Sequence, residues 1–164
     1  MTLIQILVKK GLLEKEKAAY KEAYEIVKNQ QPSNLYSTIG ETLHRFKKAG
    51  INMIVVSSDP CENLLGDINQ FNLKGLFNEI NCDIYDKAEN IEETIKRNGF
   101  NPKETIFIGD TTHEIKAGKK AGTLTAAVTW GFHNEDKLKS SKPDFIIRSL
   151  EELESMVLSR SILS

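Results

Sequence analysis

The 164-residue sequence lacks any apolar run close to the roughly 20 residues that a membrane-spanning helix requires. It also lacks an excess of charge of one sign, because 22 Lys and Arg residues are balanced by 23 Asp and Glu residues. Affinity for a phosphate backbone needs a clustered cationic excess. The composition therefore argues against a membrane segment and against nucleic acid as a partner.

Cysteine is scarce, and only Cys61 and Cys82 are present. They form no CxxC pair, and neither lies near a histidine at the spacing of a metal site. The N-terminal apolar run is too short for a secretory signal, and no charged region precedes it. We therefore expect two reduced, partly buried thiols in a cytoplasmic protein, with neither a disulfide nor a zinc pair.

From residue 35 onward the sequence alternates between short apolar segments and amphipathic segments. The apolar segments are typical of buried parallel strands, and they cover residues 51–56, 105–108, 124–129 and 145–147. Helical patterns follow them, over residues 60–71, 91–98, 115–121 and 150–157. This alternation predicts an α/β fold, a three-layer Rossmann-like parallel sheet with helices on both faces. Such a fold binds its ligands at the carboxyl ends of the strands.

Residues 1–34 follow a different pattern from the α/β core of residues 35–164. Residues 15–28 are charged and helix-favouring, with one apolar face. The apolar residues 3–8 fit either a helix face or a buried strand, because periodicity does not separate the two over so short a run.

Two serines follow the first predicted strand of the core. The hydroxyl groups of Ser57 and Ser58, together with the N-terminus of the next helix, can hold a phosphate oxygen. Asp59, Pro60 and Glu62 predict the N-cap and first turn of that helix. Serines after strands also commonly serve as turn or capping residues, so both interpretations stand.

Two carboxylates and one lysine lie at other predicted strand and helix ends. Asp110 and Glu114 begin the segment after residues 105–108, and oxygen ligands of this kind suit Mg²⁺. The alternative is that Asp110 caps the helix and Glu114 complements the helix dipole. Lys87 lies before the helix at 91–98, where it can neutralise a phosphate and a carboxylate, although a single lysine is more often a solvated surface charge.

Taken together and in this order, these features resemble the haloacid dehalogenase-like hydrolase superfamily, in its branch of phosphoglycolate and phosphoserine phosphatases. VVSSDP resembles the second family motif and IFIGDTTHE the fourth, and the spacing from Lys87 to Asp110 resembles that of the third. LYSTIGETLHRFKKAGI, AGTLTAAVTWGF and KPDFIIRSLEEL extend the resemblance over residues 35–155.

The resemblance implies roles for the residues that match the motifs. Ser57, Ser58 and Lys87 would bind phosphate, with Ser57 and Lys87 also acting as catalytic residues. Asp110 and Glu114 would be the Mg²⁺ ligands. The substrate would be a small phosphorylated metabolite, as expected for a phosphomonoester hydrolase that depends on Mg²⁺.

The family's first motif, DxDx(T/V), supplies the nucleophile and the general acid, and no aspartate precedes Asp59 here. One explanation is that residues 1–34 are a helical cap remnant and that the motif lies upstream. The other is a degenerate first strand plus helix, with residues 3–8 in the central strand position and Val8 and Lys10 at the two aspartate positions.

Either explanation predicts a chain that is inactive or a very weak hydrolase, with a weak or incomplete Mg²⁺ site. A second chain, such as a homodimer partner, could complete the sheet. The alternative function is a non-catalytic phosphate-binding or protein-interaction module on the same scaffold.

Overall fold

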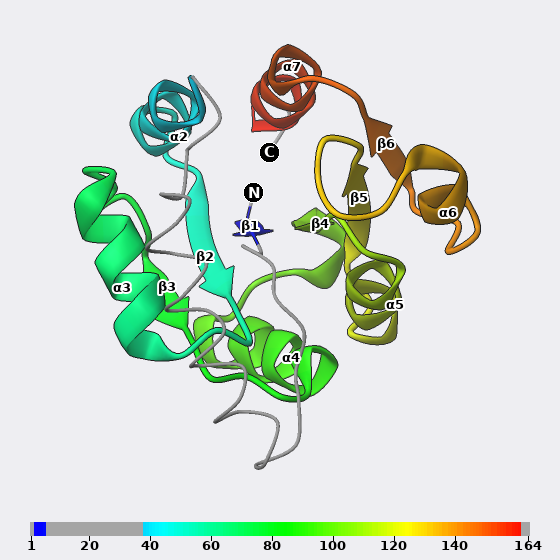
Figure 1. Cartoon of the computed structure of the whole chain (residues 1–164), viewed down its shortest axis with the longest axis horizontal. Coiled ribbons are helices and arrows are strands. Elements are labelled where there is room, and N and C mark those ends of the chain that lie inside the picture. The colour runs from blue at the N-terminus through cyan, green and yellow to red at the C-terminus, as the bar shows by residue number, and fades with distance from the viewer. Residues whose placement is uncertain (1, 6–37, 162–164) are drawn as a thin grey trace, which may run out of the picture.

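Six parallel strands form one sheet in the computed structural model, which describes residues 2–5 and 38–161 (Figure 1). In sheet order the strands are β3 (Glu79–Asn81), β2 (Asn52–Val56), β1 (Thr2–Gln5), β4 (Thr105–Gly109), β5 (Leu124–Val128) and β6 (Phe145–Ile147). The parallel α/β fold that the sequence predicts is confirmed. β3 was not predicted, because this three-residue strand has a polar residue at each end.

β1 occupies a central position in the sheet. Its Leu3 lies opposite Met53 of β2 and opposite Ile106 of β4. Without a strand here, two rows of backbone groups in the middle of the sheet would be unpaired. The strand order reverses at β1, and such a switch point is where open α/β sheets bind ligands.

This position is the one that the degenerate-strand explanation gives to residues 3–8, and the structure describes residues 2–5 of that region. Val8, Lys10 and the predicted helix at 15–28 lie outside the described residues, and so does most of the predicted segment 1–34. The assignment of that segment stays a prediction.

Helices cover both faces of the sheet. One face carries α2 (Ile39–Lys48), α3 (Cys61–Gln70) and α7 (Leu150–Ser161), and the other carries α4 (Lys87–Asn98), α5 (Thr112–Lys120) and α6 (Glu135–Lys139). Alternate residues of β2 enter different cores, with Met53 and Val55 packed toward the first face and Ile54 and Val56 toward the second. Burial on both sides explains the continuous apolar run.

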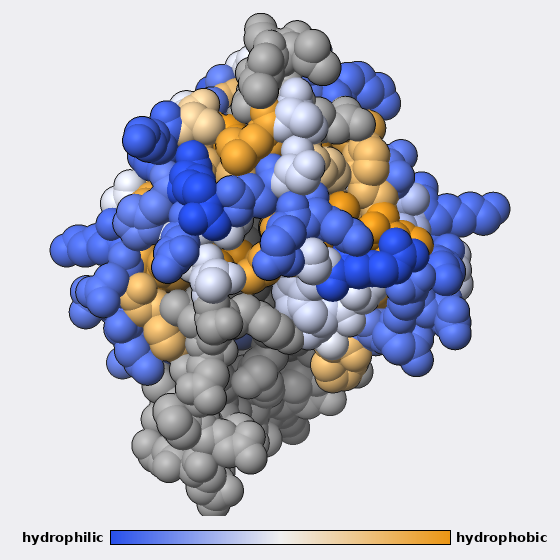
Figure 2. All heavy atoms as spheres, turned by 90° about the horizontal axis from the view of Figure 1, so that it is seen from above, coloured by the Kyte–Doolittle hydropathy of each residue, from blue (hydrophilic) through white to orange (hydrophobic). Residues whose placement is uncertain are grey.

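On the face that Figure 2 shows, hydrophilic side chains surround several apolar areas. Arg45 of α2 pairs with Glu154 of α7 at 2.6 Å and joins two helices of one layer. None of the helices in the described part of the chain is both long and apolar enough to span a membrane.

Helix ends agree with the sequence in one case and differ in another. α4 ends at Asn98, the last residue of the helical pattern predicted over residues 91–98, and Gly99 caps it with a φ of 66°, a left-handed conformation that favours glycine. The expected N-cap at Asp59 is wrong, because α3 begins at Cys61 with Pro60 at the N-cap position. The Asp59 carboxylate instead accepts a hydrogen bond from the Ser57 hydroxyl group.

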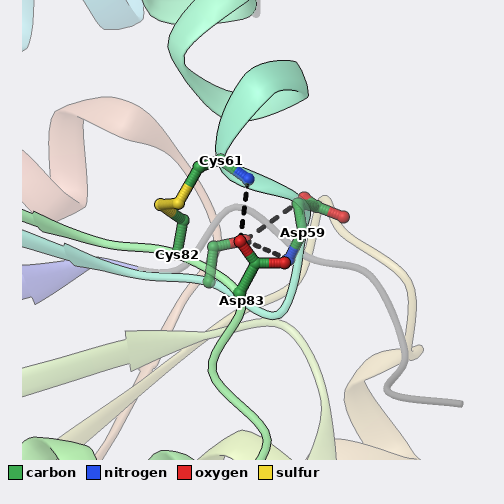
Figure 3. The surroundings of a disulfide bond; sticks show 5 residues. Asp59, Cys61, Cys82 and Asp83 are labelled. Carbon is green, nitrogen blue, oxygen red and sulfur yellow. Dashed lines mark hydrogen bonds between the residues drawn. A yellow bond between two sulfur atoms is a disulfide. The ribbon is translucent and has the colours of Figure 1, made fainter. Parts of the chain in front are cut away.

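The expectation of two reduced thiols is also wrong, because Cys61 and Cys82 form a disulfide (Figure 3). Cys61 is the first residue of α3, and Cys82 directly follows β3. Pairing of β2 with β3 brings the two cysteines together. Their Cα atoms lie 5.1 Å apart, within the range of a disulfide. The sequence separation alone does not reveal this proximity, which depends on a strand that the sequence did not predict.

Candidate active site

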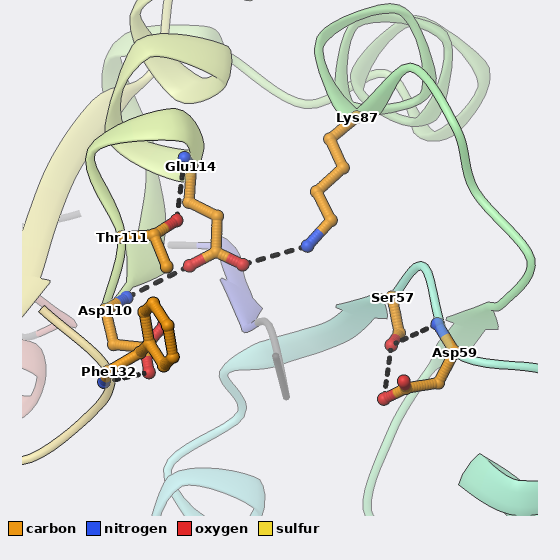
Figure 4. Close-up of polar contacts among 7 residues, drawn as sticks. All are labelled: Ser57, Asp59, Lys87, Asp110, Thr111, Glu114 and Phe132. Atoms are coloured by element: carbon orange, nitrogen blue, oxygen red, sulfur yellow. Dashed lines mark hydrogen bonds and ion pairs between the residues drawn. The ribbon is translucent and has the colours of Figure 1, made fainter. Parts of the chain in front are cut away.

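The carboxyl end of β2 leads into a turn that buries Ser57 completely. The Ser57 N–H donates to the Asn81 carbonyl oxygen at 2.8 Å, which fastens the turn to β3. Its Oγ donates to Asp59 Oδ2 at 3.2 Å and accepts from the Asp59 N–H at 3.1 Å (Figure 4). Ser58 is only partly buried. Both serines therefore lie at the carboxyl edge of the sheet, and the carboxylate beside Ser57 is a partner that sequence analysis missed.

A buried ion pair joins the first turns of α4 and α5. Lys87 is the first residue of α4, and its Nζ lies 2.8 Å from Glu114 Oε1. Their side chains are only 5% and 2% exposed. Asp86 caps α4 by accepting from the Glu89 N–H, and Thr111 caps α5 by accepting from the Glu114 N–H. The capped helix ends thus fix both members of the pair.

Burial raises the pKa of Glu114 to about 7. The Lys87 ammonium opposes this effect by stabilising the carboxylate, whereas the nearby Asp110 carboxylate adds to it. Glu114 therefore titrates near neutral pH. Perturbed ionisation of a buried group at a strand edge is typical of functional sites.

Asp110 directly follows β4 and is held by three hydrogen bonds. Its N–H donates to Glu114 Oε2 at 3.0 Å, its Oδ2 accepts from the Phe132 N–H at 2.8 Å, and its carbonyl oxygen accepts from the His133 N–H at 3.1 Å. The other carboxylate oxygen, Oδ1, is buried and has no hydrogen-bond partner among the described residues. An unpartnered buried carboxylate oxygen is costly unless a cation binds it. Asp110 Oδ1 is therefore an open ligand position.

Glycines make room for the two carboxylates. A Cβ atom at Gly109 would lie 2.7 Å from Glu114 Cβ and from Glu114 Oε2. A Cβ atom at Gly131 would collide with the Asp110 side chain. The loop after β5 therefore supports Asp110 through Gly131 and through the Phe132 N–H. Local sequence patterns did not predict this role for Gly131 and Phe132, although the phrase AGTLTAAVTWGF contains both residues.

The predicted residues lie around one end of the sheet (Figure 4). Lys87, Asp110 and Glu114 form a single network of contacts. Ser57 lies across the carboxyl end of β1 from Asp110 and Glu114, and Lys87 approaches from α4. The arrangement thus presents hydroxyl, ammonium and carboxylate groups at the switch point of the sheet.

The donor set fits a hard cation such as Mg²⁺, because Asp110 and Glu114 supply only oxygen. Glu114 Oε1 and Oε2 already contact Lys87 Nζ and the Asp110 N–H. Asp110 Oδ1 is thus the better-placed ligand atom of the two carboxylates. Water or phosphate oxygens would have to fill most of an octahedral shell.

A cavity of about 420 Å³ lies between the first turn of α4 and the exposed side of α5. Lys87 lines it together with His113, Lys116 and Lys120, whereas Asp86 supplies an acidic group. Two of the three lysines have acidic partners, because Lys87 pairs with Glu114 and Lys120 Nζ lies 3.9 Å from an Asp86 carboxylate oxygen. Asp110 and Ser57 are not among the residues that line this cavity.

Comparisons with known proteins identify the family and the fold. The profile of the family described as haloacid dehalogenase-like hydrolase matches residues 1–128. A phosphoglycolate phosphatase from Synechococcus elongatus is 23% identical over 121 residues, which cover 73% of this chain and 57% of that protein. Pyrophosphatase PpaX from Bacillus velezensis is 31% identical over 128 residues, which cover 72% of this chain and 57% of that protein.

The fold has a solved counterpart in a haloacid dehalogenase-like family hydrolase from Streptococcus pneumoniae, with a TM-score of 0.77 and 14% identity. That match covers 94% of this chain and 97% of the solved one. The chain spans less than three fifths of the length of the two curated relatives above. Because the family profile covers most of the sequence and the fold agrees with it, this chain belongs to the haloacid dehalogenase-like hydrolase family.

Proposed function

We propose that this chain binds Mg²⁺ and the phosphate group of a small metabolite, and that it hydrolyses phosphomonoesters very weakly or not at all. The observation that carries the proposal is the buried, unpartnered Asp110 Oδ1 beside the Lys87–Glu114 pair. A cation at Asp110 would satisfy this oxygen. An anion would then be attracted to the cation and to Lys87.

The described side chains suggest a division of roles. Asp110 would bind Mg²⁺ directly, and Glu114 would hold both Lys87 Nζ and the Asp110 N–H in place. Ser57, Ser58 and Lys87 would contact phosphate oxygens, since hydroxyl and ammonium groups are suitable donors. When bound, Mg²⁺ would polarise the phosphoryl group.

Weak turnover follows from a missing nucleophile. No aspartate precedes Asp59, so neither aspartate of the family's first motif is present in this sequence. A positioned nucleophile contributes on the order of 7–11 kcal/mol to the lowering of a barrier. A cation with a phosphate cradle does not replace that contribution.

A small phosphorylated metabolite is the ligand class that the surroundings favour. The cavity beside Lys87 has a volume of about 420 Å³, which suits a small molecule, and Lys116 and His113 line it too. The curated relatives described above are named as a phosphoglycolate phosphatase and a pyrophosphatase. Both names refer to small phosphate compounds.

The test is a turnover assay with a generic aryl phosphate in the presence of Mg²⁺. We expect wild-type turnover at or slightly above that of buffer, with any excess abolished by Asp110→Asn. Asp136→Asn is the matched control, because the Asp136 side chain is 97% exposed and its loss should change nothing. Turnover near the median of about 10 s⁻¹ for enzymes would overturn the proposal of weak activity.

The alternative is a non-catalytic phosphate-binding or protein-interaction module, which predicts no excess over buffer in any variant. Reproducible turnover that Asp110→Asn abolishes and Asp136→Asn preserves would exclude this alternative. No turnover together with no binding of inorganic phosphate would favour the protein-interaction form of this alternative and would contradict the proposal.

A further inference from the structure

A second group of potential ligands lies on the β3 side of the Ser57 turn. The sulfur atoms of Cys61 and Cys82 and a carboxylate oxygen of Asp83 all lie within 4.8 Å of one another (Figure 3). We propose that reduction of the disulfide converts these three residues into a binding site for a thiophilic divalent cation such as Zn²⁺. This site is separate from the Mg²⁺ site at Asp110.

Backbone contacts hold the three side chains together independently of the sulfur–sulfur bond. The Cys61 N–H donates to Asp83 Oδ2 at 3.2 Å, and the Asp83 N–H donates to the Asp59 carbonyl oxygen at 2.9 Å. Asp83 has a φ of 58°, a left-handed conformation that few residue types other than glycine adopt readily. Because these contacts do not involve sulfur, we expect the cluster to persist after reduction.

The chemistry of the cluster suits Zn²⁺ better than Mg²⁺. Two thiolates and one carboxylate are ordinary zinc ligands, with Zn–S near 2.3 Å and Zn–O about 2.0–2.2 Å. Tetrahedral ligands at those lengths lie roughly 3.5–4 Å apart, so the two bonded sulfur atoms have to separate on reduction, while the Asp83 carboxylate lies within reach of both. Water can supply the fourth ligand, because Asp83 is exposed and both cysteines are partly exposed.

The start of α3 adds an electrostatic contribution. Cys61 is the first residue of this 10-residue helix, and partial positive charge at a helix N-terminus favours a thiolate there. Cys82 and Asp83 reach the same place from the segment after β3. The ligands therefore come from two elements that the β2–β3 pairing holds together.

The disulfide and the bound cation exclude each other. A dithiol reductant breaks the sulfur–sulfur bond of Cys61 and Cys82, donates two electrons and two protons, and becomes a disulfide itself. The cation then displaces one proton from each thiol to water as two metal–sulfur bonds form. Reoxidation requires release of the cation, so the redox state decides whether the site is open.

The test uses Cd²⁺ as a spectroscopic probe for Zn²⁺. Protein reduced with a phosphine and freed of reductant without oxygen should bind one Cd²⁺ per chain, with the ultraviolet charge-transfer band of cadmium thiolates. Zn²⁺ should displace it, and the oxidised protein should show no band. Cys61→Ser and Cys82→Ser should each weaken binding by at least tenfold, as should Asp83→Asn.

Asp136→Asn serves as the exposed carboxylate control and should bind Cd²⁺ as wild type does. The proposal is overturned by the absence of a band in reduced wild-type protein, or by unchanged affinity in the Cys61 or Asp83 variant. If a variant fails to fold, the rate of alkylation of the two cysteines in the reduced wild-type protein tests the proposal instead. Zn²⁺ should slow the modification of both cysteines, and equal rates with and without Zn²⁺ would contradict the proposal.

Discussion

Replacing Lys87 by methionine removes the positive charge of the buried ion pair while keeping a long side chain in the same place. Glu114 would then lose the partner that lies 2.8 Å from its Oε1. Both side chains are almost fully buried, so water cannot replace the lysine without rearrangement. We therefore expect Lys87→Met to reduce the free energy of unfolding in a way that depends on the charge of Glu114.

The magnitude follows from the protonation state of Glu114. Removing one partner of a buried ion pair costs about 3–5 kcal/mol when the other stays charged. The pKa of Glu114 in the folded protein, about 7, means that the carboxyl is protonated at pH 5 and largely ionised at pH 8. In the variant, Glu114 loses the ammonium group that lowers its pKa, so it takes up a proton at pH 8 instead of staying charged, and Lys87→Met should cost about 1.4 kcal/mol more at pH 8 than at pH 5. At pH 5 only a hydrogen bond to a neutral carboxyl is lost, which costs about 1 kcal/mol.

Urea unfolding, monitored by circular dichroism, measures the change in the free energy of unfolding at pH 5 and at pH 8. A chelator in the buffer prevents any contribution from metal binding. Lys96→Met is the matched control, because Lys96 is an exposed lysine of the same helix and should change stability by less than about 0.5 kcal/mol. Equal losses for Lys87→Met at the two pH values would refute the reasoning. Such a result would mean that Lys87 stabilises the fold by packing and not by its charge.

Other predictions concern the same region. Folding raises the Glu114 pKa from 4.5 to about 7, so the free energy of unfolding of the wild type should fall as the pH rises through that interval. Urea titrations should show that Glu114→Gln removes up to about 3 kcal/mol of this pH dependence. Gly109→Ala should lose about 1–3 kcal/mol in thermal unfolding, because its Cβ would meet Glu114. Gly66→Ala should instead raise the free energy of unfolding by up to about 1 kcal/mol, because Gly66 is helical and an added Cβ atom would meet nothing within 4 Å. Similar changes in stability for Gly109→Ala and Gly66→Ala would contradict the steric argument. Reduction of Cys61–Cys82 should lower the free energy of unfolding by about 3 kcal/mol, because the bond closes a loop with a sequence separation of 21, and unchanged stability would contradict this estimate.

Local sequence patterns predicted much of the fold. The cores of β2 and β4 appear as apolar runs because both faces of these strands are covered by helices. β3 could not be recognised, since Glu79 and Asn81 flank a single apolar residue and the strand exists through its pairing with β2. The disulfide between Cys61 and Cys82 was mispredicted for the same reason.

The candidate site was partly predictable. Lys87, Asp110 and Glu114 follow recognisable patterns at strand and helix ends, and the structure places them in one network. The contact of Ser57 with Asp59 was not expected, because Asp59 also fits the sequence signal of an N-cap. The hydrogen bond from the Phe132 N–H to Asp110 joins loops after different strands, and local sequence patterns do not report such contacts.

The most direct test of the account is a calorimetric titration of inorganic phosphate with and without Mg²⁺, in the wild type and in Asp110→Asn. The account predicts that Mg²⁺ tightens phosphate binding by the wild type, because the cation at Asp110 and the phosphate attract each other. It predicts no such enhancement in Asp110→Asn. A wild-type phosphate affinity that does not change with Mg²⁺, or an enhancement that persists in Asp110→Asn, would contradict the central claim.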